Sequence, residues 1–450
     1  MFSPRENLLF KHRLLSELVR LAWPIAVSML SYSLMTVVDT LFVGRLGAAA
    51  LAGVAWAGVV AFSLLCFGIG LVRAVKVRVS QAVGAGHARQ AAEALTAGLA
   101  LAGAVGLIAV GLGYACLDLL RAGAASSAAA ELATDYFVLR NVGAPVVLAG
   151  FALREGRYGV GDSRSPMHAA VVSNLANIPL NATLIFGLGL GVRGAALATL
   201  VAQLLDLFLL FWSLRRSPLG LGRLRLEACR DVLRIGWPLG LEFFLDVGAF
   251  SALAGVIARM GEVELASHQI AIQLSHFAFL PAIAVSEAAS VLAGQAVGAR
   301  EDRLVLQVAS RGLLLNVGYV SLCGIVLLLG GEALACCFSP DRHVQQTAAR
   351  LLHVAAALTL LFSIYVVPRA VLRGVGSERF TAAVTVSLAW LFPVPAAYWL
   401  GLGLGWGAVG GWLGLCAEVT TGFLILWWKL GRKSWLVGAE RARIRLRADG

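Results

Sequence analysis

Several carboxylate and amide side chains lie inside long apolar stretches of this sequence, where a charge without a partner is costly. Tyr32, Thr36 and Asp39 are spaced by four and three residues, which places them on one face of a helix. Charged groups cost roughly 2.5–3.5 kcal/mol in hydrocarbon, so those that persist there usually face a cavity or a partner. We predict that Asp39 binds a cation or a proton. The alternative is a structural carboxylate near the outer membrane interface.

Three amides form a second polar stripe. Asn174, Asn177 and Asn181 are spaced by three and four residues, and Pro179 between them frees a backbone carbonyl as a further ligand. Amide oxygens together with one carboxylate make a hard-oxygen site suited to Na⁺, to which the hydroxyl of Thr199 could contribute. The alternative is hydrogen bonding between helices, which Asn side chains make in membranes.

Carboxylates recur in the second half of the chain. Glu242 and Asp246 are one helical turn apart. Two carboxylates this close repel each other, so one of them is expected to be protonated near neutral pH. This arrangement suits a proton-coupled site or a cationic substrate, with Asp246 as the stronger candidate. The alternative for Glu242 is a solvated position near the cytoplasmic end of its helix.

The next predicted helix also carries a polar face, and Pro281 is expected to kink it. The members of this face are candidates for lining or closing a substrate cavity: Gln269, Gln273, His276 and Glu287. His268 lies beside the face, and the alternative for both histidines is a hydrogen-bonded packing role. No set of His, Cys and carboxylate residues has the spacing of a metal site.

Two basic residues, Arg73 and Lys76, lie inside another apolar stretch. Glu287 occupies the position of Arg73 in the second copy of an internal repeat. We predict that Arg73 and Glu287 form a salt bridge that closes one side of a central cavity, with Lys76 as part of the same gate. The alternative is that the basic side chains extend to the inner interface of the membrane.

The chain contains nearly the same pattern twice. The matched segments keep a constant spacing along the chain, apart from one drift of a single residue: Trp23-Pro24 and Trp237-Pro238, Gln81–Ala85 and Gln295–Ala299, Gly159–Gly161 and Gly374–Gly376, Gly187–Gly191 and Gly401–Gly405. Two similar halves in one membrane chain predict a site at their interface, which is exposed to either side as one half rocks on the other. The repeat therefore predicts a transporter.

The composition is that of a membrane protein. The 450 residues are 59% hydrophobic and 14% charged, with a mean hydropathy of +0.82, whereas soluble chains carry about 25% charge. We predict an all-α polytopic fold of twelve transmembrane helices in two six-helix bundles related by a pseudo-two-fold axis. The expected spans are 18–43, 50–83, 91–117, 131–156, 165–187, 193–214, 232–258, 264–297, 304–328, 345–372, 380–401 and 406–430.

The net charge of +12 is concentrated at the two ends of the chain and in the link between its halves. The positive-inside rule places these parts in the cytoplasm and the protein in the plasma (inner) membrane. The predicted parts are a cytoplasmic N-terminal segment (1–17), an N-lobe (18–214), a cytoplasmic linker (215–231), a C-lobe (232–430) and a basic cytoplasmic tail (431–450). Topology and anionic lipid explain the basic tail, so no nucleic-acid partner is expected. The tail either lies on the inner membrane surface or is disordered.

The segment Val38–Gly47 resembles the multidrug and toxic compound extrusion (MATE) family of transporters. Other segments support the resemblance, which covers roughly residues 15–430: Ser80–Gly86, Gly159–Arg164, Gly194–Thr199 and Ser267–Ala271. It implies a two-lobed exporter of twelve helices, driven by Na⁺ or H⁺. In the DNA-damage-inducible branch, which the chain resembles more, an Asp, an Asn, a second Asp and a Thr form the cation site of the N-lobe.

Asp39, Asn177 and Thr199 match this set, whereas Asn181 stands where the family has the second Asp. The substitution removes a charge from the implied site. In the other main bacterial branch a carboxylate on the seventh helix is important, and Asp246 falls at that place.

We therefore expect a cation-coupled antiporter that exports amphipathic organic compounds by alternating access. It is expected to need no cofactor beyond the coupling ion, and to work as a monomer in the bilayer. The alternative is a flippase or exporter of a lipid-linked or anionic metabolite, held by Arg73 and Lys76. A channel needs a filter or a ring of charge, and an enzyme needs a nucleophile or a metal set; the sequence shows neither pattern.

Overall fold

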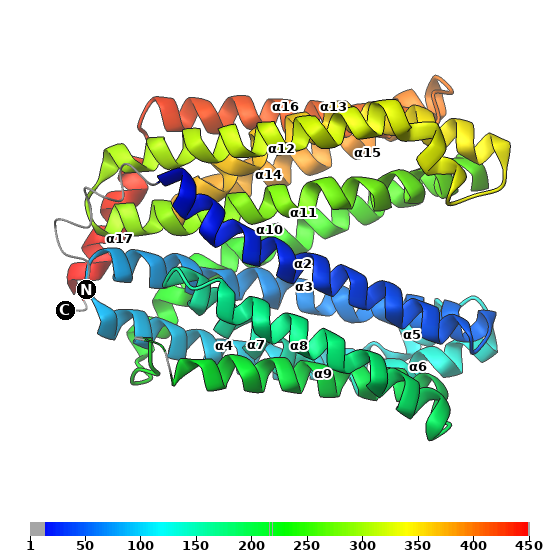
Figure 1. Ribbon diagram of the computed structural model, residues 1–450, viewed down its shortest axis with the longest axis horizontal. Helices are drawn as coiled ribbons and strands as arrows, with labels where there is room; N and C mark the ends of the chain where they lie inside the picture. Colours follow the sequence, from blue (N-terminus) through cyan, green and yellow to red (C-terminus); the bar gives the residue numbers. More distant parts are fainter. Residues whose placement is uncertain (1–13, 216, 218, 449–450) are drawn as a thin grey trace. The chain divides into compact units, whose positions relative to one another are not determined.

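The computed structural model describes residues 14–215, 217 and 219–448. Most of the predicted N-terminal segment, residues 1–13, therefore lies outside the described residues. The described part of the chain is helical and contains no strand. Its first half consists of α2 (Leu14–Gly44), α3 (Ala48–Gly84), α4 (Ala88–Ala115), α5 (Leu117–Ala122), α6 (Ser127–Val142), α7 (Ala144–Gly159), α8 (Arg164–Asn181), the π-helical η1 (Ala182–Gly187) and α9 (Gly191–Leu214) (Figure 1).

The second half repeats this order. It consists of α10 (Leu226–Ala258), α11 (Glu262–Gly298), α12 (Asp302–Cys336), α13 (Arg342–Gly374), α14 (Glu378–Leu391), α15 (Pro393–Ala396), the π-helical η2 (Ala397–Gly403), α16 (Ala408–Gly431) and α17 (Leu436–Ala448). Of the two alternatives for the basic tail, disorder is wrong for Leu436–Ala448, which is helical.

The helices are long and apolar enough to confirm the predicted polytopic fold. Eleven of the described helical segments can cross a membrane by length and composition. A twelfth span arises if α6 and α7, which meet at an angle of 48°, are counted together. Pro145 lies in the first turn of α7, where it cannot continue the hydrogen bonding of α6, so the break has a local cause.

The chain divides into two compact units, which are described separately. The N-unit consists of Val27–Val83 and His87–Phe244, and the C-unit consists of the described residues of Met1–Ala26, Gly84–Gly86 and Leu245–Asp449. The borders fall inside α2 and α10 and before the last residue of α3, so these helices contribute to both units. The lobe boundaries expected from the sequence stay a prediction.

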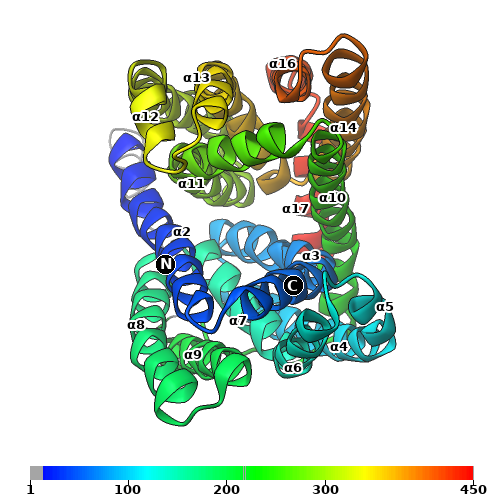
Figure 2. The same ribbon diagram turned by 90° about the vertical axis from the view of Figure 1, so that its right-hand side faces the viewer.

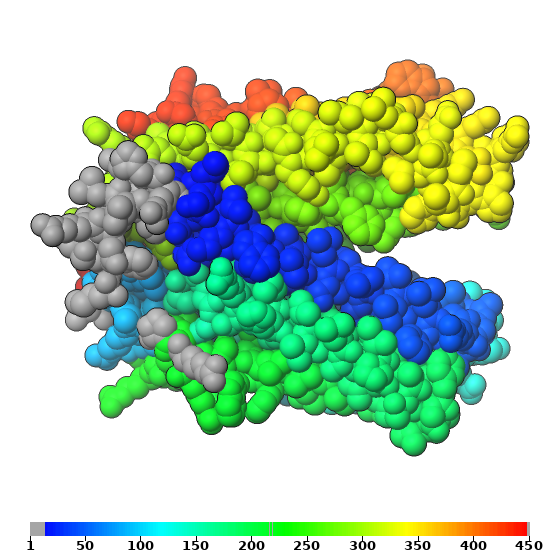
Figure 3. Space-filling view, viewed as in Figure 1, coloured from blue at the N-terminus to red at the C-terminus, as the bar shows by residue number. Residues whose placement is uncertain are grey.

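Small residues bring the helices of the N-unit close together. Gly106 on α4 faces the backbone of Pro145 on α7, and Gly194 on α9 faces the backbone of Leu184 in η1. A side chain at either glycine would collide with main-chain atoms, which is how small residues tighten helix packing in membranes. Figure 2 shows α8 and α9 side by side, and in Figure 3 the part of α2 that belongs to the N-unit, in blue, lies along α8 at the surface.

Matching turns confirm that the second half repeats the first. Gly47 and Gly261, which the repeat pairs, both have positive φ, at +107° and +120°. Gly161 and Gly376, whose separation along the chain is greater by a single residue, have φ of +87° and +88°. The turns after α2 and α7 thus have the same form as the turns after α10 and α13.

The predicted match of Gly187–Gly191 with Gly401–Gly405 is wrong by two residues. The N–H of Leu188 donates to the carbonyl of Thr183, and the N–H of Leu404 donates in the same way to Trp399. The separation of matched positions therefore grows along the chain, by one residue before the turns after α7 and α13 and by one more before these hydrogen bonds. The alternation of Gly and Leu in both segments hides this shift in the sequence.

Helix α17 packs against the C-unit rather than extending away from it. Trp435, Ala439, Ala442 and Leu446 are buried. Arg443 donates to the carbonyl of Val297 at the end of α11 (3.1 Å) and forms an ion pair with Asp302 at the start of α12 (2.5 Å). The tail helix thus joins the turn between α11 and α12.

Candidate functional site

The polar stripe of α8 meets the acidic residue of α2 inside the N-unit. The Nδ2 atom of Asn181 donates to Asp39 Oδ1 (2.6 Å) and to Asn177 Oδ1 (2.7 Å). The hydroxyl of Thr199 on α9 donates to its own helix at Ala195 (2.9 Å) and lies 3.4 Å from Asp39 Oδ2. The structure therefore brings together the four residues of the predicted cation site.

This cluster contains polar atoms that the protein does not satisfy. Asn177 and Asn181 are completely buried, with 0% exposure. Asn177 Nδ2 and Asn181 Oδ1 have no hydrogen-bond partner among the described residues. Buried amide atoms nearly always have a hydrogen-bond partner, and a buried polar atom without a hydrogen bond costs about 1–3 kcal/mol. The site therefore has oxygen and nitrogen atoms available for a ligand or water.

Neighbouring helices fix the position of the cluster. The two asparagines lie one turn apart at the end of α8, directly before η1, and the contact of Gly194 with η1 draws the start of α9 towards them. Arg140 on α6 binds Gln203 of α9 at 2.7 Å and is the basic residue whose charge acts on Asp39. The carboxylate thus lies among amides and a hydroxyl, with one cation at a greater distance.

The second half of the chain provides an internal comparison for this site. By the spacings of the matched turns, Leu253 takes the place of Asp39, Ala397 that of Asn181 and Leu415 that of Thr199. Leu253 and Ala397 are fully buried and both pack against Gly411 on α16. Since the same fold packs this position with apolar residues, the polar set of the first half is not needed to hold the helices together.

Tyr32 and Thr36 lie on the same helix as Asp39 but take other partners. The hydroxyl of Thr36 donates to the backbone of Tyr32 at 3.1 Å. The hydroxyl of Tyr32 contacts Arg154 on α7 and donates to Asp206 on α9 at 3.3 Å. Asn174, the first amide of the stripe, donates to Ser31 at 2.7 Å. The bonds of Tyr32 and Asn174 thus join α2 to the rest of the N-unit, whereas that of Thr36 stays within α2.

The pair of Arg154 and Asp206 was not predicted from the sequence. Arg154 Nη2 lies 2.8 Å from Asp206 Oδ2, and both side chains are nearly buried. The rings of Tyr32 and Phe151 cover the guanidinium at 4.9 and 5.0 Å. The sequence does show one charged residue inside each of two predicted spans. The pairing of Arg154 with Asp206 follows only once α7 and α9 are known to be neighbours.

The basic residues of α3 also have partners within the N-unit. Arg73 lies over the ring of Phe243 at 4.5 Å, and Lys76 forms a buried ion pair with Glu155 at 3.1 Å. Glu287 is partly buried on α11. Because Arg73 and Glu287 belong to different units, the gate between them stays a prediction.

In the C-unit, Asp246 forms an ion pair with Arg369 on α13. The sequence does not predict this pairing. Glu242, which belongs to the N-unit, has 1% exposure, so the alternative of a solvated position is wrong.

The polar residues of α11 divide into two groups. Gln269, Gln273 and His276 are exposed in this structure. His268 is buried, and its Nδ1 accepts a hydrogen bond from Trp412 Nε1 at 3.0 Å. This contact favours the packing role for His268. Among the described residues, no group of three His, Cys, Asp or Glu side chains could hold a metal ion.

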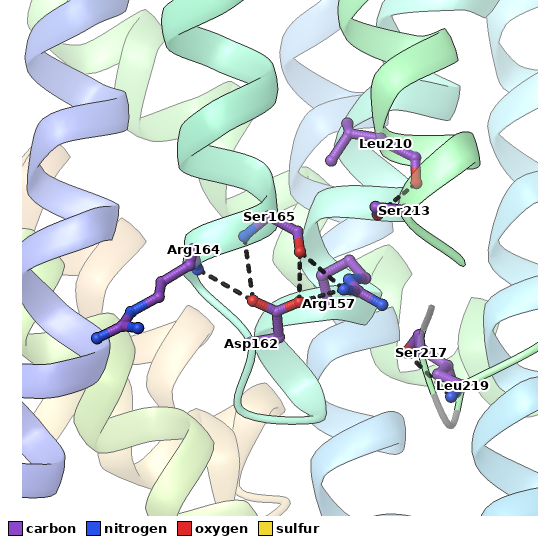
Figure 4. A network of polar contacts seen from close by, with 8 residues as sticks. All are labelled: Arg157, Asp162, Arg164, Ser165, Leu210, Ser213, Ser217 and Leu219. Carbon is purple, nitrogen blue, oxygen red and sulfur yellow. Dashed lines mark hydrogen bonds and ion pairs between the residues drawn. The ribbon is translucent and has the colours of Figure 1, made fainter. Parts of the chain in front are cut away.

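Asp162 organises the turn between α7 and α8 (Figure 4). It accepts hydrogen bonds from the backbone N–H groups of Arg164 and Ser165 (3.0 and 3.1 Å), from the Ser165 hydroxyl (2.7 Å) and from Arg157. Partial burial alone would raise the pKa of Asp162. The bonds from Ser165 and the charge of Arg157 outweigh this effect, so the pKa lies below its ordinary value. This motif of the family resemblance is a structural turn.

The amino-acid sequence matches a known family of proteins. The MatE family profile matches residues 24–183 and 238–399. The chain is 32% identical to "Probable multidrug resistance protein NorM" of Pseudomonas aeruginosa, covering 93% of this chain and 90% of that protein. It is 28% identical to the protein of the same name from Idiomarina loihiensis, covering 93% and 94%. These names do not confirm the predicted nearness to the DNA-damage-inducible branch.

Solved structures share the fold. The eukaryotic MATE transporter AtDTX14 superposes with a TM-score of 0.86 at 19% identity, covering 96% of this chain and 98% of that one. A transporter of the MOP superfamily from Pyrococcus furiosus, described as having a binding pocket of reverse polarity, superposes with a TM-score of 0.84 at 22% identity, covering 96% of both chains. At these identities the likeness concerns the fold.

Proposed function

Because the chain belongs to the MatE family and is thus a membrane transporter rather than an enzyme, we propose that it exports amphipathic organic compounds in exchange for a cation. The names of the NorM relatives support multidrug compounds as the substrate class. The transporter is proposed to act as a monomer in the inner membrane. Both termini are proposed to lie in the cytoplasm, because basic residues are concentrated at the ends of the chain.

The observation that carries the proposal is the cluster of Asp39, Asn177, Asn181 and Thr199. It is polar, buried and incompletely hydrogen bonded, and the equivalent position in the second half is apolar. A polar set that the fold does not require for packing is a candidate for a function. We assign it the role of binding the coupling ion, with Asp39 as the charged ligand.

The two candidate ions make different demands on the cluster. A proton would reside on Asp39 itself and would remove one acceptor from the amide of Asn181. Na⁺ requires several oxygen ligands, so the amide of Asn181 would have to turn and present Oδ1 in place of Nδ2. The free Oδ1 atom makes that turn chemically reasonable, because no bond of this oxygen to a described residue is lost.

Transport by alternating access follows from population shift in this proposal. The ion favours one arrangement of the two halves and the substrate favours the other. The coupling is reciprocal, so the ion lowers the affinity for substrate by the same factor by which substrate lowers the affinity for the ion. Residues of α11 such as Gln269, Gln273 and His276 remain candidates for contact with substrate.

The resemblance to the DNA-damage-inducible branch applies to the N-half site, through Asp39, Asn177 and Thr199. The alternative of a flippase or an exporter of anionic metabolites loses support, because Lys76 already has its counter-charge in Glu155. Arg73 stacks on Phe243 instead of lying among anionic ligands.

The proposal is tested in proteoliposomes with separately imposed Na⁺ and H⁺ gradients, using cationic dyes as substrates. Wild-type protein should transport dye under one of the gradients, and Asp39→Asn should lose that dependence. Asp135→Asn is the matched control, because Asp135 lies in the same unit and forms an exposed ion pair with Arg193. If neither gradient drives dye transport by the wild-type protein, the proposal is wrong.

A further inference from the structure

The linker between the two halves is held against α4 of the N-unit. The N–H of Gly222 donates to the Thr96 hydroxyl at 3.0 Å, and the same hydroxyl lies 3.1 Å from the Gly222 carbonyl oxygen. Gly222 lies so close to α4 that a Cβ atom on it would come within 2.5 Å of the Glu93 nitrogen. The carboxylate of Glu93 also forms an ion pair with Arg225, at 3.7 Å. This part of the linker is therefore fixed to the N-unit.

The same segment exposes three leucines. Leu221, Leu224 and Leu226 are 49%, 61% and 67% exposed, whereas Leu219 is buried. Leucines exposed singly are common on protein surfaces, but a group of neighbouring exposed apolar residues marks a site of interaction with a protein or a membrane. Leu226 is the first residue of α10, so the exposed leucines continue from the linker into that helix. A partner is therefore expected for these side chains.

Arginines without an opposite charge lie between and after these leucines. Arg223, Arg230 and Arg234 are exposed, and none of them forms an ion pair with another described residue. The two carboxylates of this stretch, Glu227 and Asp231, are already engaged in ion pairs within the N-unit, at 2.9 and 3.2 Å. We call the three exposed leucines and these three arginines the linker surface. It combines an apolar patch with an unbalanced positive charge.

The position of the linker along α4 places the linker surface at the membrane interface. Thr96, which holds Gly222, lies in the third turn of α4, about 12 Å from the start of this helix at Ala88. Helix α4 is one of those that can cross a membrane. Residues 219–225 have no regular secondary structure, and an irregular backbone is not exposed to lipid within the hydrocarbon region. The segment therefore lies at the interface, where leucines reach acyl chains and arginines reach head groups.

We propose that the linker surface binds anionic phospholipid of the adjoining leaflet, with the phosphates held by its arginines and the acyl chains in contact with its leucines. Bound lipid then anchors the N-unit, because the linker is fixed to α4. A second copy of the chain fits the surface less well, since a symmetric contact would bring the unpaired arginines of the two copies together. The inference depends on neither the coupling ion nor the cargo of the transporter.

The test places the full chain in phosphatidylcholine nanodiscs that contain a small fraction of phosphatidylglycerol with a photoreactive head group. After illumination, mass spectrometry of peptides locates the labelled residues. The wild-type protein should be labelled within residues 219–234. Excess unlabelled phosphatidylglycerol should prevent this labelling, whereas the phosphatidylcholine of the nanodisc does not. Glycerol 3-phosphate, a soluble phosphate of similar chemistry, should have no effect.

The contribution of the arginines is measured with a triple variant, Arg223→Gln, Arg230→Gln and Arg234→Gln. Each basic residue near an anionic membrane surface strengthens binding about fivefold, so labelling of the segment should fall roughly tenfold or more. These arginines form no ion pair within the described part of the chain, and the melting temperature should therefore stay within a few degrees of wild type.

The matched control is Arg45→Gln, Arg121→Gln and Arg259→Gln, which removes the same charge from three other exposed positions. Arg121 and Arg259 follow the ends of α4 and α10 that lie away from the linker. Labelling of the segment in this control should stay within about twofold of wild type, because the charges lost are distant from the linker surface.

Several results would overturn the inference. Wild-type labelling that avoids residues 219–234, or that falls equally in the control variant, would show that the linker surface holds no lipid. Competition by glycerol 3-phosphate as strong as that by phosphatidylglycerol would identify the ligand as a soluble phosphate. An unlabelled segment in nanodiscs that contain two chains would assign the surface to a second copy. Because none of these readouts involves transport, the result is independent of the proposed function.

Discussion

At the scale of single residues, Asp39 has surroundings that its counterpart in the second half lacks. The amide nitrogen of Asn181 lies between Asp39 Oδ1 and Asn177 Oδ1. Two oxygens that face one point in this way are suited to binding a cation. The counterpart Leu253 is packed against Gly411 with no polar partner required. Comparing the Asp39 cluster with its apolar counterpart therefore distinguishes residues required for packing from residues proposed to bind the ion.

Replacing the polar set by its apolar copy tests this separation. The variant Asp39→Leu, Asn181→Ala and Thr199→Leu should insert and keep a melting temperature within a few degrees of wild type, because the second half already folds with these residues. It should lose cation-driven transport. Melting in detergent and dye transport in proteoliposomes measure the two effects. A variant that fails to fold would show that the polar set is structural.

Asp162 gives a prediction for pH dependence outside the membrane spans. Its folded-state pKa lies below the ordinary value of about 3.9, so its bonds add stability above that value, and this stability is lost as pH falls through the folded pKa. Asp162→Asn should therefore lower the melting temperature at neutral pH. The difference from wild type should shrink below about pH 4. A difference that stays constant with pH would contradict the role of the charge.

At the scale of elements, close contacts decide where helices can lie. Gly438 in α17 approaches the carbonyl of Gly376, and a Cβ there would come within 2.7 Å of it. Gly438→Val should displace α17 from the C-unit and speed hydrogen exchange across Leu436–Ala448. Val437→Ala is the control, because Val437 is exposed on the same helix. Unchanged exchange in Gly438→Val would mean that α17 is not held by this contact.

The sequence predicts elements better than partnerships between them. The spans follow from apolar length, and the stripe of Asn177 and Asn181 follows from helical spacing, so their meeting with Asp39 agrees with the prediction. Arg154 and Asp206 lie on helices separated by a third, and nothing in their spacing indicates a pair. The register after η2 was also misjudged, since a Gly–Leu alternation fits two alignments equally well.

At the scale of the whole molecule, the two halves share a backbone plan but divide the ionisable groups differently. The N-half keeps a carboxylate among amides, and the C-half keeps an ion pair of Asp246 and Arg369. One repeated fold thus carries two different polar clusters, of which the N-half cluster is proposed to bind the coupling ion.

The predicted gate of Arg73 and Glu287 belongs to this scale. Arg73→Glu should abolish transport, and the exchange Arg73→Glu with Glu287→Arg should restore it, because the attraction is the same with the charges reversed. Dye transport and membrane insertion are measured for each variant. If the well-inserted double variant stays inactive, the two residues do not form a gate. Phe243→Leu tests the local alternative, in which the stacking of Arg73 is what matters.

The apolar counterpart of the Asp39 cluster also offers a site for engineering. Leu253, Ala397 and Leu415 occupy a location whose backbone carries the proposed ion-binding set in the other half. Installing Asp, Asn and Thr there would give the protein a duplicate receptor for its driving ion. The number of ions exchanged per molecule of cargo, a property usually regarded as fixed for a transporter, would then become adjustable by three substitutions.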